Sequence, residues 1–467
     1  MKEVLKDLTQ EYKNHHCPIE FNFKEFAIRY LNEKRPNNYP HNICPYPAKV
    51  YPYIPLFFLS IDELCPSDGV VLDPFAGSGT VLLESLINPF SKRSVFGVEL
   101  NPFGRLISQV KTTPLDLDMT DIRRLLIKLN YTYKSEKEHE SPHFSNINTW
   151  FSQNAIKKLS KLKHAIEAFD CSDDLKDFLW LCFARVVRKV SRADPYIPPP
   201  VLLKANKYEK SPDKYQKVKT LVLQNENPGV WEIFEKVFTD NLIKISNLNG
   251  IRESGGKSIK AELIWDDARK IKKGVMATKG LIRKDNASPL PSDSIDFIIT
   301  SPPYLTAQKY IRTSKLELLW LGIKEKELKE LDTNTIGTER AAAKEVKMIE
   351  EIGITSVDNI ITWTLNKSPM KAALVYKYFR GMQLAIKEMY RVVKDGSYVI
   401  LVVGNNKVLG KIVDTHRLLT DLALMEGFKE ILILKDSIRK KGMITRRHNS
   451  GGLINEEFTI VLKKEGV

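Results

Sequence analysis

One segment of the chain constrains its fold more than any other: residues 70–86, which read VVLDPFAGSGTVLLESL. The segment opens with the β-branched and apolar residues of a buried strand, passes through a loop that contains Gly77 and Gly79, and closes on a helical run. Glycines let a backbone approach a ligand closely, and a helix N-terminus offers free N–H groups. The segment therefore predicts an α/β sheet with a ligand-binding loop after its first strand.

This glycine loop differs from two common phosphate-binding loops. The dinucleotide fingerprint needs a third glycine where this chain has Leu82, and the P-loop needs a Gly-Lys-Ser/Thr ending that is absent here. A second predicted strand, residues 94–98, leads to Glu99, about twenty residues after the loop. An acid at the tip of a second strand suits the hydroxyls of a ribose, although Glu99 by itself could be a solvated strand-end carboxylate.

A second informative segment is the loop at residues 300–304, TSPPY, which follows the strand-like run IDFII. Two prolines fix φ and remove two backbone donors, so the loop is rigid and presents carbonyl acceptors. A hydroxyl precedes the prolines and an aromatic ring follows them. This arrangement can grip a flat ring that carries an amine, although Pro-Pro-Tyr on its own is most often an ordinary turn.

Together the segments resemble the S-adenosylmethionine-dependent DNA methyltransferases that modify exocyclic amines, at cytosine N4 or adenine N6. The resemblance implies a Rossmann-like, mostly parallel seven-stranded sheet of the α/β class with a large, mainly helical insertion. The matching segments are residues 73–80 for the cofactor loop, 300–304 for the catalytic loop, 99–102 for the second strand, 47–49 with Pro52 for an N-terminal cofactor segment, and 265–269 for a strand that ends near the adenine.

The resemblance implies S-adenosyl-L-methionine as the cofactor and a site without metal ligands. Asp73 would hold the methionine ammonium directly or through water, Glu99 the ribose, and Asp267 the adenine amine, with Asp266 as an alternative to Asp267. Tyr304 would stack on a flipped-out base while Ser301 and the Pro302 carbonyl orient its amine. The implied cofactor-binding residues are Asp73, Phe75, Gly77, Gly79, Thr80, Glu99 and Asp267, and the implied catalytic residues are Ser301, Pro302, Pro303 and Tyr304.

The residue before the two prolines of the catalytic loop bears on the identity of the modified base. Serine at position 301 is commoner among the cytosine-N4 members, which favours that base and leaves adenine N6 open. Methylation of cytosine C5 would need a thiolate in a Pro-Cys loop, and none of the five cysteines follows a proline. The cysteines are also scattered without a Cys-x-x-Cys pair, so we expect neither a zinc site nor disulfides, and a cytoplasmic location.

The charge composition of the chain indicates what kind of molecule it binds. Lys and Arg number 72 against 57 Asp and Glu, a net charge of +15, as expected for a protein that meets a polyanion. We therefore expect double-stranded DNA as the partner, with a cognate restriction endonuclease as a possible functional partner; an unspecific basic surface is the alternative. No apolar run is long enough for a membrane span and no apolar stretch follows the first residues, so we expect neither a membrane span nor a signal peptide.

The chain divides into residues 1–117 with the cofactor loop, a mainly helical insertion at 118–258, and residues 259–467 with the catalytic loop. The insertion is the first candidate for DNA target recognition, through the Lys- and Tyr-rich residues 204–219 or through Arg185, Arg188, Lys189 and Arg192 on one helix face. Each could equally be a solvated loop or helix face. The competing candidates are residues 315–371, which are rich in Glu and Lys, and the basic run at 439–448 between the last two strands.

Local patterns also predict elements around these motifs. The predicted elements are helices at 23–31, 150–169, 175–190, 231–248, 378–393 and 412–425, strands at 295–300 and 398–403, and a hairpin of 430–435 with 458–463.

Two other functions fit part of the pattern. An RNA methyltransferase acting on guanine N2 shares both loops, but such enzymes usually carry Asp before the prolines and a short spacer between the loops. A non-catalytic DNA-binding relative would keep the fold, but the intact glycines, Glu99 and catalytic loop argue against it.

Overall fold

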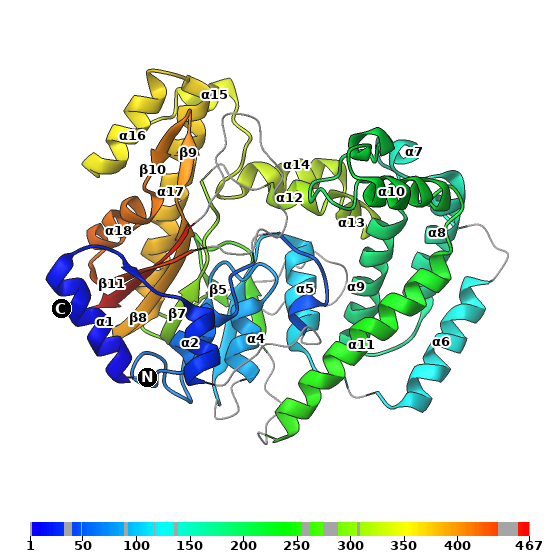
Figure 1. The fold of residues 1–467 in the computed structure, drawn as a ribbon, viewed down its shortest axis with the longest axis horizontal. Helices are drawn as coiled ribbons and strands as arrows, with labels where there is room; N and C mark the ends of the chain where they lie inside the picture. The colour runs from blue at the N-terminus through cyan, green and yellow to red at the C-terminus, as the bar shows by residue number, and fades with distance from the viewer. Residues whose placement is uncertain are drawn as a thin grey trace.

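The computed structural model describes residues 2–31, 40–47, 49–87, 92–115, 117–134, 139–254, 261–273, 288–305, 309–437 and 456–466. Its centre is a twisted sheet with strand order β1-β11-β12-β8-β7-β2-β3-β4 (Figure 1). The strands are β1 (Ile19–Glu20), β2 (Val70–Asp73), β3 (Ser94–Val98), β4 (Glu262–Trp265), β7 (Ile295–Thr300), β8 (Val393–Gly404), β11 (Phe428–Ser437) and β12 (Glu456–Lys464).

The sheet confirms the predicted α/β class and corrects the predicted strand number, since it has eight strands and not seven. The additional strand is β1, whose two residues pair in parallel with the edge strand β11. Only β12 runs antiparallel to its neighbours. The central strands β2 and β7 are almost entirely buried, which is why they read as continuous apolar runs.

Helices from both ends of the chain surround the sheet. α17 and α18 pack against its β8 side and α4 and α5 against its β2 to β4 side. These helices are α1 (Lys2–His15), α2 (Phe23–Tyr30), η1 (Pro40–Asn42), α3 (Tyr53–Leu59), α4 (Thr80–Ile87), α5 (Pro102–Thr112), α16 (Thr355–Leu365), α17 (Pro369–Val392) and α18 (Thr415–Met425).

The described part of the predicted insertion is helical and occupies the opposite end of the molecule in Figure 1. Its helices share one apolar core with Phe103 of α5 and Trp320 of α13, so this core also joins the insertion to the sheet domain. The helices are α6 (Met119–Tyr133), α7 (Ile147–Trp150), α8 (Gln153–Ala168), α9 (Asp173–Val190), η2 (Ala205–Tyr208), α10 (Pro212–Gln224) and α11 (Val230–Ser254), followed after the catalytic loop by α12 (Tyr310–Thr313), α13 (Lys315–Trp320), α14 (Glu325–Asn334) and α15 (Ala343–Val346).

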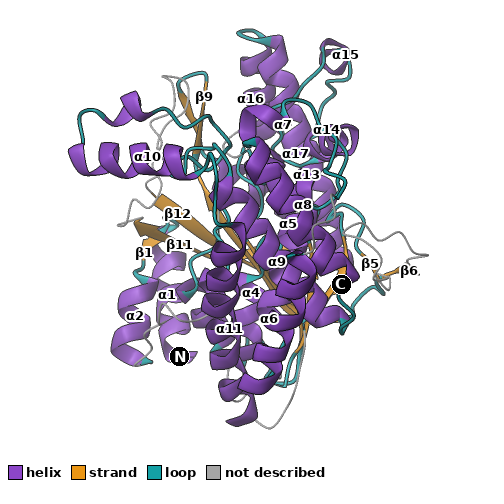
Figure 2. Ribbon diagram, turned by 90° about the vertical axis from the view of Figure 1, so that its right-hand side faces the viewer, coloured by secondary structure: helices purple, strands orange, loops and turns teal. Residues whose placement is uncertain are grey.

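The Lys- and Tyr-rich residues 204–219, read as a phosphate-tracking segment or a solvated loop, form η2 and most of α10. Pro212 stands in the first turn of α10, where a missing N–H costs nothing, and only Val218 of this helix is buried. Figure 2 shows α10 extending away from the other helices.

Two predicted boundaries were wrong. The helix expected from residue 378 begins at Pro369, and Ile412 lies in a strand instead of the following helix. Leu409 and Gly410 both have positive φ, which makes the two-residue turn of a hairpin between β9 (Asn406–Val408) and β10 (Lys411–Val413).

The hairpin predicted from residues 430–435 and 458–463 is confirmed by the antiparallel pair β11 and β12, while the basic run at 439–448 lies outside the described residues. A further two-stranded pair joins β5 (Lys272–Lys273) to β6 (Ser288–Pro289). None of the helices in the described ranges has both the length and the apolar composition of a membrane span.

Candidate active site

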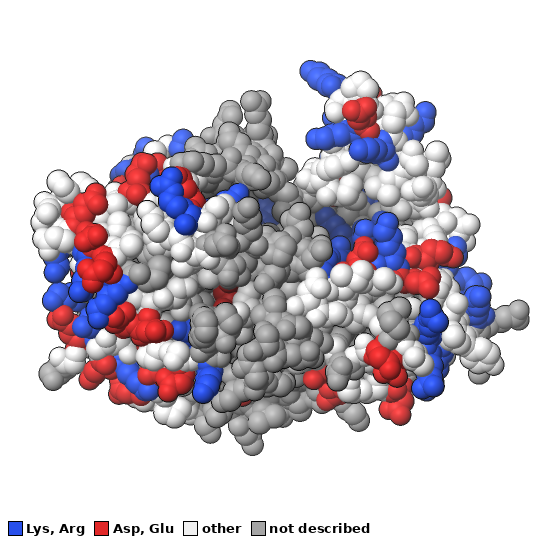
Figure 3. All heavy atoms as spheres, turned by 60° about the horizontal axis from the view of Figure 1, so that its bottom comes forward, with Lys and Arg blue, Asp and Glu red and all other residues white. Residues whose placement is uncertain are grey.

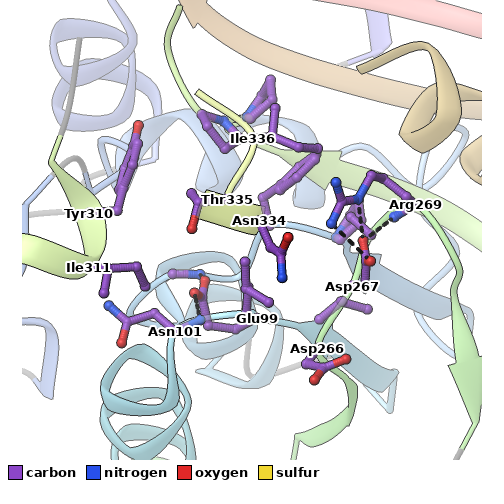
Figure 4. Close-up of a pocket in the computed structure, with 18 of the residues that line it drawn as sticks. Glu99, Asn101, Asp266, Asp267, Arg269, Tyr310, Ile311, Asn334, Thr335 and Ile336 are labelled. Atoms are coloured by element: carbon purple, nitrogen blue, oxygen red, sulfur yellow. Dashed lines mark hydrogen bonds and ion pairs between the residues drawn. The ribbon is translucent and has the colours of Figure 1, made fainter. Parts of the chain in front are cut away.

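A pocket of about 740 Å³ lies at the carboxyl ends of the parallel strands β2, β3, β4 and β7. The chain runs from β2 to β3 and β4 on one side and returns to β7 on the other, so β2 and β7 flank the topological switch point where α/β sheets bind ligands. The loops after all four strands contribute to its wall, together with Tyr46, α12 and residues 334–336 (Figure 4). The predicted cofactor and catalytic loops therefore open into one pocket.

The two glycines of the cofactor loop have different positions. Both adopt the left-handed conformation, with φ of 53° at Gly77 and 71° at Gly79. Gly77 lines the pocket, whereas a Cβ on Gly79 would lie 2.9 Å from the Ser108 side chain of α5. Gly77 thus gives the backbone access to the pocket, and Gly79 gives the loop its close packing on α5.

Asp73 ends β2 beneath the pocket. It is 2% exposed, and its Oδ1 accepts hydrogen bonds from the Thr300 hydroxyl at 2.6 Å and from the Phe75 amide at 3.1 Å. Loss of hydration raises the pKa of Asp73 to about 7, and these two hydrogen bonds oppose the rise. Asp73 joins the ends of β2 and β7, and neither it nor the buried Thr80 contributes to the pocket wall.

Glu99 lines the pocket and also supports the cofactor loop. Its Oε2 accepts the Gly77 N–H and its Oε1 accepts the Asn101 N–H, both at 2.7 Å. Loss of hydration raises the pKa of Glu99 to about 7, although these two hydrogen bonds act to lower it. A carboxylate offers about four acceptor positions, so two remain for donors from a ligand.

Asn101 is absent from the predicted site and organises one wall of it. Its side chain accepts the Phe103 N–H and caps α5, with Pro102 in the first helical position. Its amide donates to the Tyr46 hydroxyl at 3.2 Å and to the Ser314 hydroxyl at 3.1 Å. The Asn-Pro pair before a helical run was the sequence signal for this cap.

The N-terminal segment reaches the pocket through a residue that was not predicted. Tyr46 lines the pocket, and its hydroxyl would lie 2.9 Å from a Cβ placed on Gly104. Lys49 instead donates to the carbonyls of His41 and Cys44, and Pro52 precedes α3. Ala48 lies outside the described residues.

The two acids after β4 both line the pocket (Figure 4). The carboxylate of Asp267 accepts hydrogen bonds from the Arg269 amide at 2.9 Å and from its guanidinium at 2.8 Å. The side chain of Asp266 is 44% exposed and lies 3.9 Å from the guanidinium of Arg105. Asp267 is therefore held in place by Arg269, while Asp266 has more freedom to meet a ligand.

The four predicted catalytic residues, Ser301, Pro302, Pro303 and Tyr304, all line the pocket. The Tyr304 hydroxyl donates a 2.8 Å hydrogen bond to Glu457 on β12, and the Tyr304 amide donates to the Tyr310 hydroxyl at 3.2 Å. Burial and the nearby Glu457 charge raise the pKa of Tyr304, so the phenol stays protonated.

Residues around Gly337 complete the support of the catalytic loop. Gly337 has a φ of 81°, and a Cβ at this position would lie 2.9 Å from the Tyr304 carbonyl oxygen. Glu457 and this glycine are more than thirty residues from the loop they support, and no local pattern marked them.

The arginines predicted on one face of α9 make contacts within the protein. Arg185 donates to the Ile43 carbonyl and the Asn241 side chain, and Arg188 donates to the carbonyls of Ile197 and Pro198. Arg192 makes two-pronged contact with Glu226, and Lys189 is exposed. On the face drawn in Figure 3, basic and acidic side chains are interspersed at both ends of the molecule.

The α/β fold is consistent with that of a methyltransferase, and curated proteins similar to this chain carry that class in their names. The chain is 26% identical to the type II methyltransferase M.MvaI of Kocuria varians over 84% of this chain and 81% of that protein. It is 24% identical to M.BsoBI of Geobacillus stearothermophilus over 81% and 77% of the two chains. The type II methyltransferase M.AvaI of Anabaena variabilis is also 24% identical, over 78% and 74%.

The chain is therefore a homologue of type II methyltransferases along most of its length. No family model matches it. Within the described ranges, no group of three or more His, Cys, Asp or Glu side chains is arranged to hold a metal ion.

Proposed function

We propose that this protein is an S-adenosylmethionine-dependent DNA methyltransferase that methylates an exocyclic amine at a specific site, most readily cytosine N4. The observation that carries the proposal is the shared pocket: Gly77 and Glu99 of the cofactor side and Ser301 to Tyr304 of the catalytic loop face the same volume. The type II names of the relatives support a role in restriction and modification, with an endonuclease of the same specificity as functional partner.

The cofactor side of the pocket fits S-adenosylmethionine. The two free acceptor positions of Glu99 suit the two ribose hydroxyls, and Phe75 offers an apolar contact. Asp266 or Asp267 would accept from the adenine amine. When bound, the cofactor would supply a methyl group on a sulfonium: the N–C bond forms as the S–C bond breaks, the neutral thioether leaves, and the amine releases one proton to water.

The catalytic side fits a flat base that carries an amine. The lone pair of such an amine is delocalised into the ring and lies inside a duplex, so the base has to leave the stack. Tyr304 stacks on it, and the Pro302 carbonyl and Ser301 hydroxyl accept its amino hydrogens. These contacts aim the nitrogen lone pair at the methyl carbon, and positioning of this kind provides much of the rate enhancement.

Ser301 favours cytosine as the base, with adenine N6 as the alternative. Sequencing DNA from an expressing host with detection of modified bases tests both the activity and the base. We expect N4-methylcytosine at one recurrent sequence, and recurrent N6-methyladenine would instead select the alternative base.

Two variants serve as matched controls in the same host. Gly77→Asp should abolish cofactor binding, and Tyr304→Ala should abolish transfer while cofactor binding remains. Unmodified host DNA together with methyl transfer to tRNA would refute the proposal in favour of an RNA methyltransferase. Normal transfer by Tyr304→Ala would refute the catalytic assignment.

A further inference from the structure

A second hollow, of about 490 Å³, lies next to the active-site pocket. The short helix α12 separates them: Tyr310 lines the active-site pocket, Arg312 lines the second hollow, and Ile311 lines both. The remaining wall comes from α13, α14 and the segment that follows α14. The two cavities therefore adjoin across a single short helix.

The hollow is positively charged. Its wall carries four cations, Arg312, Lys315, Lys329 and Arg340, against two carboxylates, Glu325 and Asp332. Both carboxylates already have partners, because Asp332 pairs with Arg340 and Glu325 accepts from the Ser145 amide at 3.0 Å and from its hydroxyl at 2.5 Å.

The other three cations remain available. Among the described residues, Arg312, Lys315 and Lys329 form no ion pair, although the charge of Lys315 helps to lower the pKa of Glu325. Arg312 and Lys329 are exposed. Four cations against two carboxylates leave the hollow with a net charge of +2, and this excess of positive charge favours an external anion.

The shape and chemistry of the wall indicate which anion. Arginine presents a planar fork that matches phosphate oxygens, and lysine adds a compact charge. Ile311 and the buried Leu328 give the hollow an apolar part, which suits the carbon face of a sugar. A phosphate with an attached sugar satisfies both parts better than a free ion does.

We propose that this hollow binds a backbone phosphodiester of the target DNA strand, next to the flipped nucleotide. The inference rests on the proposed function, since it takes the occupant of the first pocket to be a base of the same strand. Arg312 and Lys329 hold the phosphate, and Lys315 adds to the local positive potential.

This assignment places one backbone contact outside the insertion. Arg185 and Arg188 of α9 donate to groups within the protein, and Arg192, just after α9, pairs with Glu226. Arg312 of the hollow, in contrast, is exposed beside the catalytic loop. The insertion still borders the site through Ser145, which bonds to the first turn of α14.

The test measures binding of the full-length protein to a labelled DNA duplex at several salt concentrations. Loss of one phosphate contact should reduce the slope of log affinity against log salt by about 1. Because Arg312 and Lys329 hold the same phosphate, Arg312→Ala and Lys329→Ala should each reduce the slope by up to about 1, and the double variant should reduce it by about 1 in total. Lys326→Ala is the matched control, because Lys326 is exposed on α14, the helix that carries Lys329, and does not line the hollow.

Steady-state kinetics distinguish binding of a DNA phosphate by Arg312 and Lys329 from a role of these residues in folding. The two variants should raise the KM for DNA on the order of tenfold and leave kcat at saturating DNA and cofactor affinity unchanged. A duplex that carries a neutral methylphosphonate beside the target base tests the same contact. Wild-type protein should bind this duplex more weakly than unmodified DNA. The Arg312→Ala variant should bind the two duplexes with equal affinity.

The outcomes are distinguishable. Unchanged salt slopes in both variants, or an equal loss in Lys326→Ala, would overturn the phosphate site while wild-type methylation leaves the proposed function intact. A wild-type protein that neither binds nor methylates duplex DNA would overturn the proposed function itself.

Discussion

The hydrogen bond between Tyr304 and Glu457 gives the sharpest test of how the catalytic loop is held. It joins the loop after β7 to the start of β12, two strands away in the sheet, over 2.8 Å. The Tyr304 ring is 8% exposed, so its hydroxyl has little access to water as a substitute partner. Tyr304→Phe keeps the ring and removes only this donor.

The expected cost follows from the type of bond. Hydrogen bonds to charged groups contribute about 1.5–3 kcal/mol, so Tyr304→Phe should lower the free energy of unfolding by about 1–3 kcal/mol. Burial already raises the pKa of Glu457, and loss of the Tyr304 bond raises it further, so protonation of the carboxyl offsets part of the cost.

Activity should fall in proportion to what each variant removes. Tyr304→Phe retains the stacking surface and should lose up to about tenfold in kcat, because only the orientation of the ring is affected. Tyr304→Ala also loses stacking, worth about 1–3 kcal/mol per base, and should lose at least a hundredfold. Glu457→Gln keeps an acceptor and should remain near wild type, whereas Glu457→Ala should resemble Tyr304→Phe.

Urea denaturation and single-turnover transfer of a labelled methyl group measure both effects. The double variant Tyr304→Phe with Glu457→Ala should cost little more than either single change, which corresponds to a coupling energy of about 1 kcal/mol or more. Fully additive costs in both assays would refute the argument, since they would mean that the two side chains act independently.

Four further predictions test other parts of the protein. Gly104→Ala places a Cβ 2.8 Å from the Gly77 carbonyl oxygen, so calorimetry should show cofactor affinity reduced by about tenfold or more as the loop shifts; unchanged affinity would contradict this packing. Because the pKa of Glu99 is raised from 4.5 to about 7, its ionised form is lost below pH 7 and cofactor affinity should fall there by up to about tenfold per pH unit, less so in Glu99→Gln. The same raised pKa favours the protonated folded state, so this group's contribution to stability should be present below pH 4.5 and lost as pH rises to about 7, measurable as a falling Tm in the cofactor-free protein. Arg188→Ala removes two contacts to backbone carbonyls and should cost about 1–3 kcal/mol in urea denaturation with no change in the salt slope of DNA binding; a reduced slope would return the α9 face to the DNA surface.

Sequence patterns predicted the elements that carry the site because the governing forces are local. β2 and β7 are buried on both faces and so read as short apolar runs, and glycine and proline mark the loops that follow them. The spacing of apolar residues wrongly predicted that the helix begins at Ile412. Leu409 and Gly410 instead form the two-residue turn of a hairpin, and Ile412 lies in its second strand.

The sequence by itself determined that a glycine loop and a Ser-Pro-Pro-Tyr loop follow buried parallel strands, since strand, turn and helix preferences are set by neighbouring residues. Only the tertiary structure decided that Asp73 supports the pocket from below while Glu99 faces it, and that Glu457 holds Tyr304. It also decided which cations are engaged inside the protein and which face the second hollow. The physical reason is that a side chain's hydration, partners and charge state depend on segments far away in the chain that fold against it, and no local pattern encodes them.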